Sequence, residues 1–427
     1  MISPKFASLL HAVVHVLSLL IITRLVATSY GLEVLGLWSL LTGTVGFLRV
    51  MDLGGANTLA RQLALNSNDV VRQSQLLDTL SVFCVVIYSI AAFALLPFLE
   101  AILPTSAEYP VIGADVKQLL AYLVLLVPLQ VLLQLQFGAL DGVNKVGYRS
   151  SIGISCGIVN VLVVVSLLPT VGFISLIFGQ FAQVLVGNLL CRSVLYGSIS
   201  PLQALPSYFS KDALSEVVSF GGRLQVGALP YAIMDPLLRT YIGSAFGLSQ
   251  VAIFELAMKM AVQLRAMIQA YLNPLVPQFT TMITEGSTEI QASLNFWNLR
   301  ASMFVIILFG LLALCSDYVS LAFLGDINSQ FQLLLYLSSA AWGLASLGVV
   351  VQLYARANNL LSWSIRGQWL MLLMVCAIIT TNTLVSTFDF SSFCGLIFVS
   401  IAIGHISSFI GETKSLSIRI SLIPFRG

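Results

Sequence analysis

The stretch Gln118–Leu140, QLLAYLVLLVPLQVLLQLQFGAL, contains no Asp, Glu, Lys or Arg. A bilayer core needs about 20 predominantly apolar residues per helix, so this stretch is long enough to cross it. It lacks the regular alternation over about ten residues that marks a transmembrane β-strand, and a lone strand could not satisfy its backbone in lipid. The stretch therefore predicts a membrane-spanning helix.

The rest of the chain repeats this pattern. Hydrophobic residues make up 58% and charged residues 9% of the 427 residues, and the mean hydropathy is +0.96. About a quarter of the residues in a soluble domain are charged, so the predicted fold is an all-α polytopic membrane protein. We identify about twelve transmembrane helices. The predicted spans are Ala7–Ala27, Leu35–Met51, Thr79–Leu99, Gln118–Leu140, Ser151–Leu168, Val171–Cys191, Phe220–Gly243, Ser249–Tyr271, Leu299–Cys315, Phe331–Tyr354, Gly367–Ser386 and Ser392–Glu412.

An internal repeat divides the spans into two six-helix bundles. The segment Arg24–Leu32, RLVATSYGL, and the segment Thr240–Leu248, TYIGSAFGL, are offset by 216 positions (240 − 24), and both end in an aromatic residue, Gly and Leu. Such repeats predict two halves related by a pseudo-twofold axis along the membrane normal, with a central cavity between them. We expect an N-terminal bundle at residues 1–191, a cytoplasmic linker at 192–219 and a C-terminal bundle at 220–427.

The basic residues of the connections predict the orientation. When the helices are placed alternately, nearly all Lys and Arg residues of the connections fall on one side, and Lys117 is the exception. Positive residues accumulate on the cytoplasmic side, so both termini are predicted to be cytoplasmic. The first span follows Lys5, and we expect it to remain as a helix because no small-residue cleavage site follows it.

Six cations lie inside or at the edge of the apolar spans, and they are the candidate binding residues. A charge at a helix centre costs roughly 2.5 to 3.5 kcal/mol on the scale derived from membrane insertion. Two carboxylates share this depth, which leaves an excess of four positive charges (6 − 2) and indicates an anionic ligand. The cations are Arg24, Arg49, Arg223, Arg239, Lys259 and Arg265, and the carboxylates are Asp235 and Glu255.

Other interpretations of these charges stay open. The cations near a membrane interface could extend to the lipid headgroups and anchor their helices there. The pairs Asp235 with Arg239 and Glu255 with Lys259 have i,i+4 spacing, which favours mutual neutralisation, and the same carboxylates are candidates for ion coupling. His11 and His15 share one helix face and are a further candidate proton site.

A resemblance to a known family appears in the first part of the chain. Its residues are Thr23-Arg24, Tyr30-Gly31, Gly36-Leu37-Trp38, Asp52-Leu53-Gly54 and Arg61. This pattern resembles the opening of the O-antigen unit flippases, which belong to the multidrug/oligosaccharidyl-lipid/polysaccharide exporter superfamily. The resemblance implies an alternating-access carrier that moves an undecaprenyl-diphosphate-linked oligosaccharide from the inner to the outer leaflet of the bacterial inner membrane. It also implies that a polysaccharide polymerase and assembly proteins are partners, and that Arg24 contacts the substrate.

Two other functions compete with this one. A cation- or proton-coupled drug antiporter of the same superfamily would share the fold but needs acidic residues for its cargo, and the first six predicted spans contain none. A membrane polysaccharide polymerase or ligase would need a large outer loop with catalytic residues. We find no catalytic cluster, nucleotide motif or cysteine pair at metal-ligand spacing. We therefore expect no enzyme activity, cofactor, metal or nucleic-acid partner.

Overall fold

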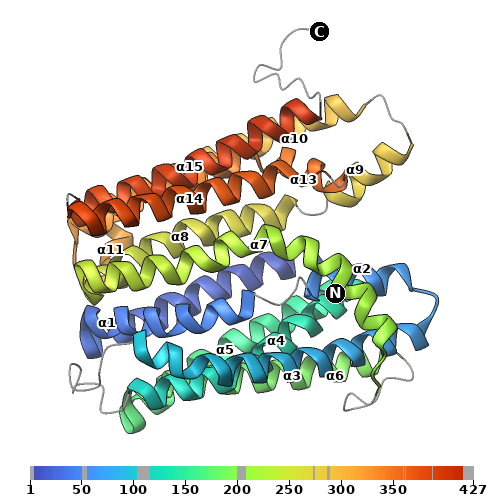
Figure 1. Ribbon diagram of the computed structural model, residues 1–427, viewed down its shortest axis with the longest axis horizontal. Coiled ribbons are helices and arrows are strands. Elements are labelled where there is room, and N and C mark those ends of the chain that lie inside the picture. Colours follow the sequence, from blue (N-terminus) through green and yellow to red (C-terminus); the bar gives the residue numbers. More distant parts are fainter. Residues whose placement is uncertain are drawn as a thin grey trace. The chain divides into compact units, whose positions relative to one another are not determined.

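A computed structural model describes residues 4–50, 55–102, 116–199, 208–272, 275–285, 289–358, 360, 362–386 and 388–416 of the protein (Figure 1). The described chain is helical and contains no strand. Its elements are α1 (Pro4–Val50), α2 (Gly55–Leu65), α3 (Val70–Ile102), α4 (Val116–Gly142), α5 (Val146–Val171), the short 3₁₀ helix η3 (Gly172–Ile174), α6 (Ser175–Tyr196), α7 (Lys211–Phe246), α8 (Leu248–Leu272), α9 (Leu275–Thr284), α10 (Ile290–Leu314), α11 (Ser316–Leu324), α12 (Ser329–Leu347), α13 (Val349–Ala357), α14 (Ser362–Val385) and α15 (Phe390–Ser415).

The predicted spans fall on helical parts of the described chain, which confirms the all-α polytopic fold class. In the described residues, seven helical segments are long and apolar enough to cross a membrane, or eight if α12 and α13 form one span bent by 40°. Two of the seven, Leu10–Gly43 and Val146–Tyr196, each cover two predicted spans in whole or in part. Neither α7 nor α8 is among the seven, because their apolar residues are interrupted by the charged residues described below.

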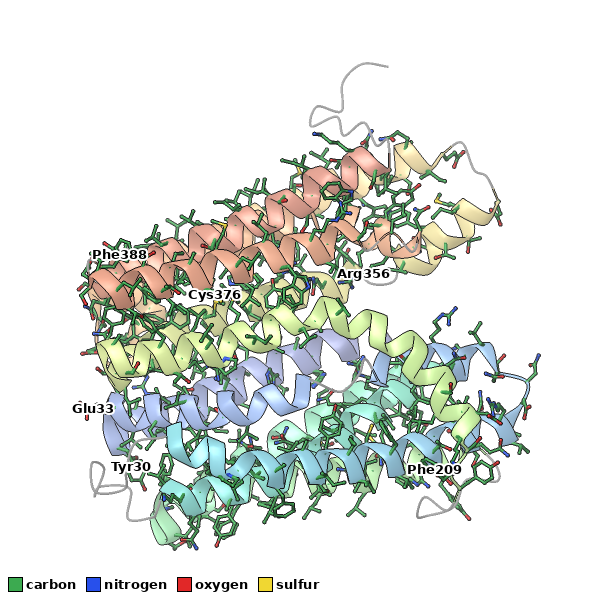
Figure 2. The ribbon with its side chains drawn as sticks, viewed as in Figure 1. Tyr30, Glu33, Phe209, Arg356, Cys376 and Phe388 are labelled. Carbon is green, nitrogen blue, oxygen red and sulfur yellow. The ribbon has the colours of Figure 1, made fainter. Side chains whose placement is uncertain are left out.

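The two corners of the sequence repeat have related backbone geometry. Gly31 interrupts α1 with φ 85° and ψ 173°, and Gly247 separates α7 from α8 with φ 96°. Side chains with a Cβ rarely adopt a positive φ, so glycine allows the chain to turn at both places. Figure 2 shows Tyr30 and Glu33 beside the first corner. The repeat detected in the sequence therefore marks two equivalent turns.

Aromatic rings stabilise both corners in a similar way. Tyr30 and Trp38 contact Phe173 edge-to-face, with ring centroids 5.6 and 5.7 Å apart. After the second corner, Phe246 packs against Phe390 and Phe393 at 5.6 and 5.4 Å. Such ring pairs contribute about 0.5–1.5 kcal/mol beyond the area that they bury. In each case a ring at the glycine corner is fixed by a ring from a later helix of the same unit.

The chain divides into two compact units, unit 1 (Met1–Thr240) and unit 2 (Tyr241–Gly427). This division falls within α7, whereas the sequence places the boundary at residues 192–219. One reason is that Arg239, near the end of α7, donates a hydrogen bond to α1 and so joins α7 to unit 1. The predicted six-helix bundles stay a prediction.

Within unit 1, α4 is the central helix, and it packs against α1, α2, α3, α5 and α6. Two glycines allow its close approach to α2: a Cβ at Gly138 would overlap the backbone of Ala56, and one at Gly142 would overlap that of Ala60. α2 is amphipathic, and its Leu59 is fully buried. Small residues four apart bring helix backbones together in this way in membrane proteins.

Within unit 2, α12 packs against α8, α10 and α15, and α14 packs against α15. Gly367 of α14 and Gly404 of α15 face each other so closely that a Cβ on either residue would overlap the other backbone. Asp389 begins α15 as its N-cap and accepts a hydrogen bond from the backbone N–H of Ser392. Hydrogen bonding to Ser392 lowers the pKa of this exposed carboxyl group.

Candidate functional site

Arg239 of α7 is a buried cation with two hydrogen-bonding partners in unit 1. Its Nη2 lies 2.7 Å from Oδ2 of Asp235, and its Nη1 donates to the carbonyl oxygen of Ser39 on α1 at 3.0 Å. Gly43 provides the space for this guanidinium, because a Cβ there would overlap it. The predicted i,i+4 pair therefore forms, and Arg239 fastens α7 to α1.

Lys259 of α8 forms the second predicted pair. Its Nζ lies 2.7 Å from Oε1 of Glu255, whose side chain is 1% exposed. The Lys259 side chain is 34% exposed, so only the carboxylate is fully removed from the surface. Both i,i+4 pairs are thus present, and each neutralises one of the candidate cations.

Arg265 of α8 is buried in unit 2. Its Nη1 is 2.9 Å from Nε2 of His405 on α15, and its Nη2 donates to Oε1 of Gln352 on α13 at 3.4 Å. The guanidinium carbon lies 5.0 Å from the ring centroid of Trp342 on α12. Arg265 therefore links α8 to three other helices, and an aromatic face orients its planar group.

The remaining candidates are dispersed. Arg24 is exposed on α1, and the side chains of Arg49 and Arg223 lie outside the described residues. His11 contacts α5, where a Cβ at Gly153 would overlap its ring, whereas His15 is exposed. Arg24 and Arg239 belong to unit 1 and Lys259 and Arg265 to unit 2, so the described cations do not form one cluster within either unit.

One expectation about acidic residues was wrong. The sequence boundaries place Asp78 outside the first six spans, but α3 begins at Val70 and buries this carboxylate to 2% exposure. Its Oδ1 lies 3.0 Å from Nη2 of Arg192 on α6. The first half of the chain therefore does contain a buried carboxylate, which is neutralised by a basic residue of the same unit.

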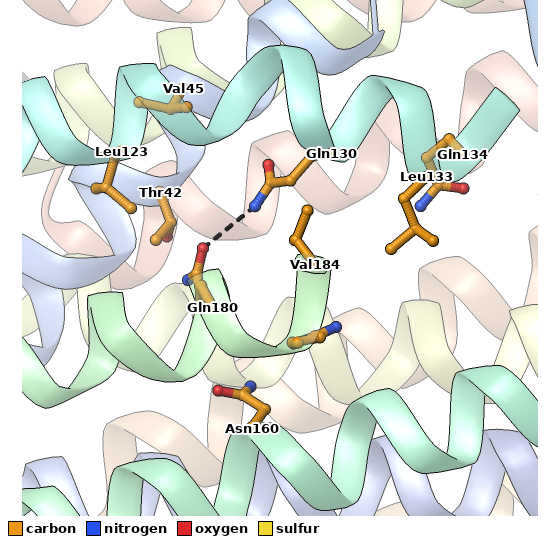
Figure 3. Close-up of a pocket in the computed structure, with 10 residues that line it drawn as sticks. Thr42, Val45, Leu123, Gln130, Leu133, Gln134, Asn160, Gln180 and Val184 are labelled. Carbon is orange, nitrogen blue, oxygen red and sulfur yellow. Dashed lines mark hydrogen bonds between the residues drawn. The ribbon is translucent and has the colours of Figure 1, made fainter. Parts of the chain in front are cut away.

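Unit 1 contains a cavity whose lining residues are not among the predicted site residues (Figure 3). It has a volume of about 200 Å³ and lies among α1, α4, α5 and α6. Five carboxamides and one hydroxyl contribute its polar wall, and none of the described lining residues carries a charge. The polar lining consists of Thr42, Gln130, Gln134, Asn160, Gln180 and Gln183, and the apolar lining consists of Val45, Leu123, Leu133 and Val184.

The carboxamides are only partly satisfied within the protein. Figure 3 shows Gln130 and Gln180 pointing toward each other, and Nε2 of Gln130 donates to Oε1 of Gln180 at 3.3 Å. Oδ1 of Asn160 is buried and accepts no hydrogen bond. Gly179 leaves room for this oxygen, because a Cβ there would overlap it. The cavity thus has hydrogen-bonding capacity that a ligand can use.

A signal for this cavity was present in the sequence. Gln130 and Gln134 are four residues apart and Gln180 and Gln183 are three apart, so each pair shares one face of a predicted span. Polar side chains inside a membrane span are expensive and indicate function. A search confined to charged residues passes over them. Among the described residues, no three His, Cys, Asp or Glu side chains gather as a metal site.

Comparisons with known proteins agree with this fold. No family model matches the chain. A protein of Shigella flexneri named "Putative O-antigen transporter" is 24% identical over 234 residues. The aligned region covers 54% of this chain and 54% of that protein, so the chain spans about half the length of the curated relative it matches.

Solved structures match over nearly the whole chain. An inward-facing multidrug resistance MATE family transporter of the MOP superfamily aligns with a TM-score of 0.73 and 12% identity, covering 97% of this chain and 98% of its own. The chain has the MATE fold. A MOP superfamily transporter from Pyrococcus furiosus, described as having a binding pocket of reverse polarity, aligns with a TM-score of 0.66 and 14% identity over 97% and 94% of the two chains. The MATE fold accords with the superfamily that the sequence resembles.

Proposed function

We propose that this protein is an alternating-access transporter that moves an oligosaccharide linked to undecaprenyl diphosphate from the inner to the outer leaflet of the bacterial inner membrane. The MATE fold supports a transporter, because the matched structures of this fold are transporters. The name of the Shigella flexneri relative supports the oligosaccharide cargo. The distribution of basic residues supports cytoplasmic termini.

The observation that supports this cargo best is the uncharged lining of the unit 1 cavity. A cationic drug in an apolar site needs a carboxylate partner, because an unpaired charge is costly to bury. The described residues that line the cavity offer carboxamides instead. The buried carboxylate Asp78 does not line the cavity, and Arg192 neutralises it. The drug antiporter is therefore the less favoured function.

Arg265 is the residue that we assign to the diphosphate. Arginine presents a planar fork of donors that suits phosphate oxygens. His405, Gln352 and Trp342 hold this fork in a fixed orientation inside unit 2. Arg239 and Lys259 are each paired with a carboxylate 2.7 Å away on their own helix.

The membrane potential supplies driving force in this proposal. An anion that leaves a negative-inside cell gains about 2.3 kcal/mol per charge per 100 mV. A diphosphate therefore gains several kcal/mol across the full membrane potential, so coupling to an ion gradient is optional. The polymerase and assembly proteins that use the translocated unit are the expected partners.

Complementation tests the proposed function. A strain that lacks its own O-antigen flippase receives the parent protein, Arg265→Gln or the control Arg300→Gln, which changes an exposed arginine on α10 that contacts Phe296. We expect surface polysaccharide from the parent and the control, and at least a tenfold loss with Arg265→Gln. Membrane levels of each protein are measured in parallel.

Resistance to cationic dyes is measured in the same strains. Cells that gain dye resistance without surface polysaccharide contain a drug antiporter, and the proposal is then wrong. Full complementation by Arg265→Gln would reject the role of Arg265 in binding the diphosphate.

A further inference from the structure

We propose that the carboxamide-lined cavity of unit 1 binds one uncharged sugar ring of the transported molecule. This inference rests on the proposed function and extends it, because it assigns the sugar and the diphosphate to different places. The phosphate is assigned to a fixed cation in unit 2, whereas the cavity in unit 1 has no charged side chain among its described lining residues.

The hydrogen-bonding chemistry of the lining fits sugar hydroxyls. A carboxamide offers two N–H donors and a carbonyl acceptor, and a hydroxyl both donates and accepts, so the two groups satisfy each other. Gln130 uses one N–H in its bond to Gln180, which leaves its second N–H for a ligand. Asn160 lines the cavity through its carboxamide, whose Oδ1 is buried beside Gly179 without a hydrogen-bond partner. A bare metal ion or a proton would leave most of these donors unused.

The apolar part of the lining fits the other surface of a sugar ring. Val45, Leu123, Leu133 and Val184 place aliphatic groups in the same wall as the carboxamides. The ring carbons of a pyranose present C–H groups that pack against such side chains, while its hydroxyls point toward the polar groups. A mixed wall of this kind is typical of ligand sites, in which a few polar groups fix orientation within an apolar pocket.

The size of the cavity limits the ligand. Drug-sized ligands occupy roughly 300–1,000 Å³, and the cavity measures about 200 Å³. It therefore suits one ring of the oligosaccharide and not the whole unit. Ordered water would fill the cavity when no sugar is bound, since it has both the room and the polar partners that buried water needs.

Nuclear magnetic resonance with free sugars tests the cavity directly. Saturation transfer is measured from the purified full-length protein in detergent to methyl glycosides of glucose, galactose, N-acetylglucosamine and N-acetylgalactosamine, with the anionic methyl glucuronide for comparison. We expect transfer to at least one neutral glycoside and weaker binding of the glucuronide. Absence of transfer to all four neutral glycosides, or equal affinity for the glucuronide, would overturn the proposal.

A paired substitution separates binding from folding. Gln130→Leu/Gln180→Leu removes both partners of one hydrogen bond, and such replacements are nearly neutral for stability. Each lost amide weakens binding by about two- to tenfold, so we expect the dissociation constant for the glycoside to rise by roughly 4- to 100-fold. Gln118→Leu is the matched control, because Gln118 is exposed on the same helix and bonds to Tyr122 outside the cavity. A glycoside affinity that is unchanged in the double variant would contradict the proposal.

Binding of undecaprenyl diphosphate that carries no sugar is measured as well. This measurement separates a failure of the cavity assignment from a failure of the proposed function. If the parent binds the bare lipid but no glycoside, the cavity assignment is wrong and the flippase function stands. If it binds glycosides through the cavity but not the bare lipid, the cavity assignment stands and the lipid-linked cargo is wrong. We expect the double variant to bind the bare lipid as the parent does.

Discussion

Arg239 holds two helices of unit 1 together. Its side chain fits beside α1 because Gly43 has no side chain there. The guanidinium is 8% exposed and bonds to the carbonyl oxygen of Ser39, one turn before Gly43 on α1. Asp235 neutralises it from the preceding turn of α7. From the sequence, the charge of Arg239 is a candidate for binding a ligand. In the folded protein this charge instead holds α7 against α1.

This arrangement predicts coupling between two residues 196 positions apart (239 − 43) in the sequence. Gly43→Ala gains about 1 kcal/mol of helix propensity, but its Cβ overlaps Arg239 and overpacking costs about 1–3 kcal/mol. We expect a net loss of stability that disappears when Arg239→Ala removes the overlapping side chain. Thermal unfolding of the parent, both single variants and the double variant measures the coupling. Additive effects of the two substitutions would contradict the predicted contact.

Contacts between residues that are close in the chain can be predicted from the sequence, whereas contacts between residues that are far apart in the chain cannot. The spacing of Asp235 with Arg239, and of Glu255 with Lys259, is enough to predict both ion pairs, because residues four apart share a helix face. The partner of Arg265 is 140 residues away at His405. No periodicity in the sequence indicates such a pair, since it depends on how the helices pack.

At the scale of the helix, glycine determines where α1 turns. Gly31 has φ 85° and ψ 173°, a region of backbone conformation that is essentially restricted to glycine. No atom lies within 4 Å of the position where its Cβ would be, so a substitution there changes only the backbone energy. A substitution of Gly31 therefore measures the free-energy cost of the backbone conformation without a contribution from packing.

We expect Gly31→Ala to lower the stability of the protein by about 1–3 kcal/mol. The control is Gly147→Ala in α5, where a Cβ also meets no neighbour and the backbone is helical. This control should be neutral or more stable by about 0.5–1 kcal/mol, because alanine has the higher helix propensity. Unfolding midpoints of the two variants in detergent provide the comparison. Equal midpoints would show that α1 does not turn at Gly31.

The elements themselves follow closely from the sequence, and the cavity does not. Apolar runs predict the helices because a membrane forces the backbone to bond within each span. The cavity depends on four helices of unit 1, α1, α4, α5 and α6, that face one another only after packing. Its carboxamides are visible in the sequence as pairs on one helix face, but the sequence does not show that Asn160 and Thr42 join them.

At the scale of the molecule, the two units offer different chemistry to the proposed cargo. Unit 1 has a neutral cavity rich in carboxamides, and unit 2 has a buried arginine oriented by an aromatic ring. An oligosaccharide joined to a diphosphate contains both kinds of group. This division of polar and charged groups distinguishes the proposed flippase from an antiporter for cationic drugs, which needs acidic residues in its binding site.

Translocation in proteoliposomes tests this central claim most directly. Undecaprenyl diphosphate carrying an oligosaccharide is incorporated in both leaflets, and a membrane-impermeant glycosidase added outside measures how much of it reaches the outer leaflet. We expect complete cleavage in vesicles with the parent protein and cleavage of only the initial outer fraction in protein-free vesicles. We also expect at least tenfold slower translocation by Arg265→Gln, and faster translocation by the parent when the interior is negative. Cleavage limited to the outer fraction despite correctly folded parent protein, with exchange of a cationic dye for protons in the same vesicles, would contradict it.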